Sequence, residues 1–116
     1  MYYVDFSAGN KDYKLRLNTR NAVALERQLG GSLLSIFGTG DSIPKIEVLV
    51  MILHASLQQY NHGITLNDTY DIFDNWLAEE HTTIDFVKLI LEIYKVSGIV
   101  PENITEQAEV SEYEKN

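Results

Sequence analysis

The sequence contains no cysteine among its 116 residues. Disulfide bonds, thiolate metal sites and cysteine nucleophiles are therefore all excluded. Long hydrophobic runs are also missing, since the longest, residues 48–53, is far shorter than the roughly 20 residues that a membrane-spanning helix needs. The first residues, MYYVDFSAGNKDYK, lack the apolar stretch of a signal peptide. We therefore expect a cytoplasmic protein that does not enter a membrane.

Positive charge is scarce and unevenly placed. The chain carries 9 Lys and Arg against 17 Asp and Glu, a net charge of −8. Nucleic-acid binding is disfavoured, because contacts to phosphate need clustered cations. Residues 1–30 carry five basic and three acidic side chains, a balance of +2, so the rest of the chain carries −10. Such an asymmetric electrostatic field orients approaching partners, and it favours a head-to-tail arrangement of copies of the same chain.

Two short strands are predicted near the amino terminus. Residues 2–6 and 13–17 have strand-like patterns, and in the second, large apolar residues alternate with Lys14 and Arg16. The intervening SAGNKD is rich in turn residues, which indicates a β-hairpin over residues 2–17. A lone hairpin is marginal in water, so its apolar face is expected to pack on another element.

Helical patterns occupy residues 20–98. Thr19 is the expected N-cap of a helix that Gly30 ends, and SLLSIFG suggests a short helical segment. Pro44 opens a helix over 45–61 that is apolar nearly all round, as expected of the central helix of a bundle.

Two more helices follow. Thr65 and Asp68 have the spacing of a capping box for a helix reaching about residue 80. Its expected inward residues are Leu66, Tyr70, Phe73 and Leu77, with Trp76 beside them. Thr82 or Thr83 caps the last helix, whose expected apolar face comprises Phe86, Val87, Ile90, Leu91, Ile93 and Tyr94.

These patterns predict one mainly α domain of the α+β kind over residues 1–101. A short amino-terminal hairpin would pack on a bundle of four to five helices. Residues 102–116 carry five acids and one lysine with few large apolar groups, which is typical of a disordered acidic tail.

The stretch HASLQQYNHGITLNDTYDIFD (54–74) is the strongest candidate for chemistry. His54 and His62 are eight residues apart, so they point about 80° apart on an ideal helix, whereas a metal pair needs i, i+4 spacing. Packing explains His54 and helix capping explains His62. Asp68, Asp71 and Asp74 lack the ligand spacing and the central glycine of an EF-hand.

Other catalytic motifs are absent from the sequence. It contains no phosphate-binding glycine loop followed by Lys-Ser and no G-x-S-x-G. We therefore predict no catalytic, metal-binding or cofactor-binding residue, no cofactor and no enzymatic activity.

Three segments in this order are distinctive: YKLRLNTRNAVALERQLGGSLLSIF, LVMILHASLQQYNHGITLNDTYDIFDNWL and DFVKLILEIYKVSG. Together they span roughly residues 12–100. This sequence resembles the tail assembly chaperones of long-tailed phages and prophages, through L-R-L-x-T-R, LE-x-x-LGG-x-L and LHASLQ-x-(Y/F)-NHGI before an acidic helix. None of these is a catalytic motif, so the likeness is one of pattern and size.

The resemblance implies a small, mainly helical protein in the cytoplasm of the infected cell that is absent from the mature virion. Its implied partners are the tape-measure protein, which such chaperones keep soluble, and the major tail-tube protein, which they help recruit. The resemblance implies no cofactor and no active site.

The charge pattern suggests which side chains bind a partner. The candidates, cations near the hairpin and acids on the third long helix, are Lys14, Arg16, Arg20, Asp71, Asp74 and Glu79. Basic residues near an exposed strand edge, together with acidic helices, also allow a homo-oligomer.

A small non-catalytic regulatory or enzyme-subunit domain is the alternative to a chaperone. A helix-turn-helix regulator is one such option, but the net charge and the lack of a basic recognition helix weigh against it.

Overall fold

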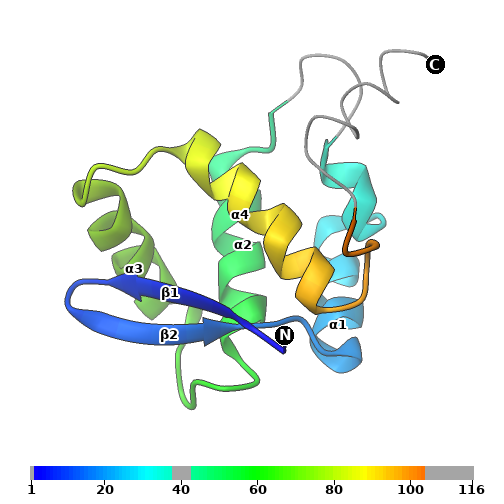
Figure 1. The fold of residues 1–116 in the computed structure, drawn as a ribbon, viewed down its shortest axis with the longest axis horizontal. Helices are drawn as coiled ribbons and strands as arrows, with labels where there is room; N and C mark the ends of the chain where they lie inside the picture. The colour runs from blue at the N-terminus through cyan, green and yellow to red at the C-terminus, as the bar shows by residue number, and fades with distance from the viewer. Residues whose placement is uncertain (1, 38–42, 104–116) are drawn as a thin grey trace.

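A computed structural model describes residues 2–37 and 43–103 of the chain. An amino-terminal β-hairpin is followed by four α-helices and one short 3-10 helix, which confirms the predicted fold class (Figure 1). The elements are β1 (Val4–Ala8), β2 (Lys11–Leu15), α1 (Thr19–Leu29), η1 (Leu33–Phe37), α2 (Ile46–Leu57), α3 (Leu66–Ala78) and α4 (Thr83–Val96). Apart from residues 102 and 103, the predicted disordered tail lies outside the described residues.

The hairpin turn is tighter than the sequence suggested. β1 and β2 are antiparallel and pair up to Ala8 and Lys11, so the turn consists of Gly9 and Asn10 alone. Both have positive φ, 59° and 64°, as a type I′ turn requires. A two-residue turn whose twist matches the strands lets much of SAGNKD pair, which moves both strands toward the turn.

Helix α2 is the centre of the molecule, as its apolar circumference predicted. It contacts α1, α3, α4 and β2, and Leu49, Leu53 and Leu57 are fully buried. The predicted range of 45–61 was too long, because α2 runs only from Ile46 to Leu57. Pro44 precedes the helix and does not form its first residue.

Side-chain amides end α2 before His62 is reached. Gln58 Nε2 donates to the carbonyl of His54 at 2.8 Å, and Asn61 Nδ2 donates to that of Leu57 at 2.8 Å. The Leu57 carbonyl also accepts from the backbone N–H of Asn61 at 3.0 Å, so both amide side chains reinforce the last turn of the helix. His62 follows in the turn and is exposed, so the cap comes from amide side chains where the sequence suggested histidine.

Helix α1 begins one residue earlier than expected. Asn18, not Thr19, is the N-cap, and its side chain accepts a hydrogen bond from the backbone N–H of Asn21 at 2.9 Å. Gly30 ends the helix in the left-handed conformation, as predicted.

Helix α3 turns a different face to the core than the sequence suggested. Thr69, Ile72, Phe73 and Trp76 are buried, whereas Leu66 and Tyr70 are 41% and 44% exposed. The hydroxyl of Thr69 donates to the carbonyl of Thr65 at 2.9 Å, so this residue can be buried with its polar group satisfied. The predicted inward positions of Leu66 and Tyr70 are therefore wrong.

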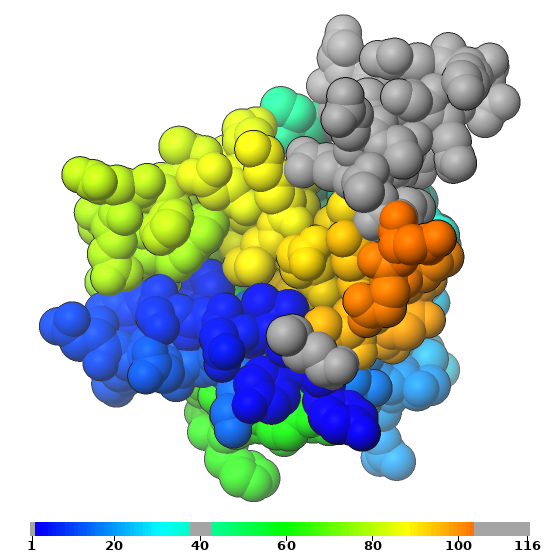
Figure 2. Space-filling view, viewed as in Figure 1, coloured from blue at the N-terminus to red at the C-terminus, as the bar shows by residue number. Residues whose placement is uncertain are grey.

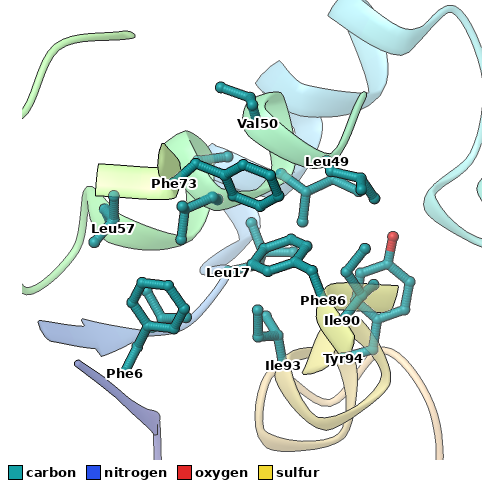
Figure 3. Close-up of a cluster of buried hydrophobic side chains, with 14 of the residues drawn as sticks. Phe6, Leu17, Leu49, Val50, Leu57, Phe73, Phe86, Ile90, Ile93 and Tyr94 are labelled. Carbon is teal, nitrogen blue, oxygen red and sulfur yellow. The ribbon is translucent and has the colours of Figure 1, made fainter. Parts of the chain in front are cut away.

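An aromatic cluster joins the hairpin to α3 and α4. The Phe86 ring lies 5.2 Å from Phe73, 5.7 Å from Trp76 and 6.4 Å from Phe6, between ring centroids, each in an edge-to-face arrangement. Phe6, Phe73 and Phe86 extend into the same core as Leu17, Leu49 and Ile90 (Figure 3). The apolar face predicted for α4 is buried except for Val87, which is partly buried.

Helices α3 and α4 begin with matching capping boxes, of which the first was predicted. The Asp68 carboxylate accepts from the N–H of Thr65 at 2.9 Å, and that of Asp85 accepts from the N–H of Thr82 at 2.9 Å. The backbone N–H is the largest cause that lowers the pKa of each aspartate. Both carboxylates stabilise the fold in their ionised form.

This arrangement predicts a loss of stability in acid. Because the folded pKa lies below the unfolded value near 3.8, the stabilisation is present above that value. It is lost as the pH falls from about 4 through the lowered pKa. Urea unfolding near neutral pH and near pH 2.5 should show a smaller acid-induced loss for Asp68→Asn/Asp85→Asn than for the wild type. An equal loss in both proteins would contradict a role for the capping boxes.

None of the helices within the described ranges is long and apolar enough to span a bilayer.

Candidate partner-binding surfaces

The predicted cations near the hairpin have different surroundings. Arg16 is partly buried, and its Nη1 donates to the carbonyls of Tyr2 at 3.0 Å and Val96 at 2.8 Å. Arg16 therefore joins the segment before β1 to the end of α4, and its guanidinium is engaged within the fold. Lys14 is exposed, with its Nζ 4.8 Å from the centroid of the Tyr3 ring, a cation–π contact. Arg20 is exposed on α1.

The predicted acids lie on and beside α3. Asp71 and Asp74 are exposed, and α3 carries no Lys or Arg. Glu79 follows the helix, and its Oε1 accepts a bond from the N–H of Gly9 at 3.3 Å, which ties the hairpin tip to α3. Asp71 and Asp74 are thus available to a partner, whereas Glu79 also has a structural contact.

The outer edge of β2 is covered by the end of α2. The N–H of Arg16 donates to the carbonyl of Ser56 at 2.9 Å, and Asn61 Nδ2 donates to the carbonyl of Lys14 at 2.8 Å. These are the backbone groups through which another strand would pair. Strand pairing along β2 is therefore blocked near Lys14 and Arg16, where the sequence suggested an open edge.

An open groove of about 490 Å³ lies between the hairpin tip and α3. Its polar lining comprises Lys11, Tyr13, His62, Asp68 and Asn75. Burial, aided by the negative charge of Asp68, raises the pKa of the Tyr13 phenol above its ordinary value. Figure 2 shows the hairpin lying against α3 and α4 on the face in view. The groove had no signal in the sequence, because the turn and α3 are distant along the chain.

Exposed apolar side chains are the surface feature that the sequence reasoning missed. Leu66 and Tyr70 lie one turn apart on α3, close along the helix to Asp71 and Asp74. Val23 is exposed on α1. Apolar side chains beside charges are typical of a protein-binding surface.

The histidines do not gather with acids into a metal site. Across residues 2–37 and 43–103, no group of three or more His, Asp or Glu side chains could hold a metal ion. His81 stacks on Trp76, with ring centroids 4.2 Å apart and planes 4° from parallel. His54 is partly buried on α2.

Comparison with known proteins places the chain in a family. It matches a family described as "Family of unknown function (DUF6096)" over residues 4–114, nearly its whole length. The chain therefore belongs to this family. No curated protein and no solved structure matches it.

Proposed function

We propose that this protein is a tail assembly chaperone of a long-tailed phage or prophage. It binds the tape-measure protein, keeps it soluble and helps recruit subunits of the major tail-tube protein. It acts without a cofactor and without catalysis in the cytoplasm of the host cell, and it leaves before the virion is complete. Self-association into a homo-oligomer is part of the proposal.

The proposal rests on the resemblance of the sequence pattern to these chaperones, and the structure shows what the residues of that pattern do in the fold. In LHASLQQYNHGI, the carbonyl of Ser56 and the amide of Asn61 hold β2. In LRLNTR, Arg16 joins β2 to the end of α4 and Asn18 caps α1. The residues that carry the resemblance therefore specify the junction between hairpin and helices, so a resemblance in this pattern supports a similar fold.

The surface supports binding as the activity. The exposed side of α3 combines Leu66 and Tyr70 with Asp71 and Asp74 and has no cation of its own. Such a surface suits a partner that carries apolar and basic side chains, because apolar contacts supply affinity and opposite charges supply orientation. A long helical protein that aggregates when alone would need such a cover.

Co-expression tests the proposal. The tape-measure protein encoded in the same genome would be produced alone, with this chain, or with an unrelated acidic helical protein of similar size. We expect it to be soluble and to co-purify only with this chain. The proposal fails if the tape-measure protein stays insoluble in all three cases, or if the unrelated protein serves equally well.

A further inference from the structure

One side of α1 is basic with an apolar centre. Arg20, Val23, Ala24 and Arg27 are all exposed and follow i, i+3, i+4, i+7 spacing, so they form one surface, here called the α1 face. Glu26 is the only acid in α1, and its Oε2 accepts a bond from the N–H of Leu33 at 2.9 Å. The α1 face therefore presents two cations with no neighbouring carboxylate on the same helix side.

One side of α3 has the opposite character. Leu66, Tyr70, Asp71 and Asp74 are exposed, and they are here called the α3 face. The two apolar residues are separated by one turn, and the two carboxylates lie on the adjoining strip of the helix. The α3 face therefore matches the α1 face, with apolar contacts on both sides and charges of opposite sign.

The two faces lie on different sides of the molecule. Helices α1 and α3 both pack on α2, and Figure 1 shows α2 between them. A contact between the α1 face of one copy and the α3 face of the next uses two different surfaces. Each added copy therefore leaves one face of each kind open, and the contact can repeat as an open chain or a closed ring.

We infer that this chain self-associates head to tail through the α1 face and the α3 face. Val23 and Ala24 meet Leu66 and Tyr70, while Arg20 and Arg27 meet Asp71 and Asp74. Helix faces form this contact, since the outer edge of β2 is already bonded to α2. The inference develops the self-association included in the proposed function. A second copy and the tape-measure protein would then compete for the α3 face, but self-association itself does not require the tape-measure protein.

Two single substitutions test the faces one at a time, because each disrupts one face and leaves the other intact. Val23→Asp places a carboxylate between the arginines of the α1 face and leaves the α3 face intact. Tyr70→Asp adds a third carboxylate to the α3 face and leaves the α1 face intact. Val23 is 42% and Tyr70 44% exposed, so neither change should disturb the core. Ile84→Asp on α4, at a residue 45% exposed, is the matched control.

Sedimentation of the full chain over a concentration series at low salt supplies the measurement. The wild type and Ile84→Asp should grow beyond dimers, and added salt should weaken this association. Val23→Asp and Tyr70→Asp should each associate about tenfold or more weakly. Their equimolar mixture should form a heterodimer and stop there, because it has one intact pair of faces while the other pair carries carboxylates on both sides.

Three results would overturn the inference: a wild type that is monomeric at every concentration, single variants that associate as the wild type does, or a mixture that fails to form the heterodimer. Circular dichroism of each variant checks that it is folded. The experiment uses purified chain alone, so its failure leaves the tape-measure result standing, and failure of co-expression leaves this result standing.

Discussion

Leu53→Ala is expected to lower the free energy of unfolding by about 2–5 kcal/mol. Leu53 is fully buried in α2, the helix that contacts α1, α3, α4 and β2. Removing its side chain loses buried apolar contact and leaves a cavity that neighbouring elements cannot fill without separating from one another. Urea unfolding followed by circular dichroism measures the change as a shift of the transition midpoint.

Leu66→Ala is the matched control for this experiment. It makes the same chemical change on α3 at a side chain that is 41% exposed, so a much smaller loss is expected. If Leu53→Ala costs less than about 1 kcal/mol, α2 is not the centre of the core.

Phe86→Ala is expected to be the most destabilising substitution, with a loss of about 3–5 kcal/mol. Its fully buried ring meets Phe73, Trp76 and Phe6 edge to face, so the change removes burial and three aromatic contacts together. It also loosens the contact between α4 and the hairpin. Urea unfolding gives the free energy.

Fluorescence gives a local measurement for the same variant. Trp76 is the only tryptophan in the chain and lies in this cluster, so its emission should shift to longer wavelength when Phe86 is removed. Tyr2→Ala, at a side chain that is 74% exposed, should change neither stability nor emission appreciably. Unchanged emission in folded Phe86→Ala would contradict the packing of the cluster.

Local signals predicted much of this fold because the interactions behind them are themselves local. A capping box joins residues three positions apart, so Thr65 and Asp68 predicted where α3 begins. Gly30 ended α1 as expected, since it adopts a left-handed conformation that other residues enter at a cost. The apolar circumference of α2 likewise predicted its central position.

Local sequence signals could not predict which face of α3 is buried. The sequence of α3 offers two overlapping apolar stripes, one with Leu66, Tyr70 and Leu77 and one with Ile72 and Trp76. Periodicity does not choose between them, because each satisfies the spacing of one helical face. Packing of Trp76 with Phe6 and Phe86, which come from β1 and α4, selects the second stripe.

The roles of the candidate charges also depended on distant partners. Arg16 was expected to bind another protein, but it bonds to the carbonyl of Val96, 80 residues away. Asp71 and Asp74 are exposed, as a partner-binding role requires, since they lie opposite the buried stripe of α3. A charge pattern identifies available groups, but only the fold shows which of them are already engaged.

The sequence by itself determined the kind of protein this is: an acidic, cysteine-free chain with a hairpin and a set of capped helices, without a catalytic motif. Composition, periodicity and caps carry that information because they act between near neighbours. Only the tertiary structure decided which face of α3 is buried, that α2 covers the edge of β2, and that the α1 face and the α3 face lie apart. Those outcomes depend on contacts between residues distant in sequence, where burial and hydrogen bonding choose among faces that local patterns leave equivalent.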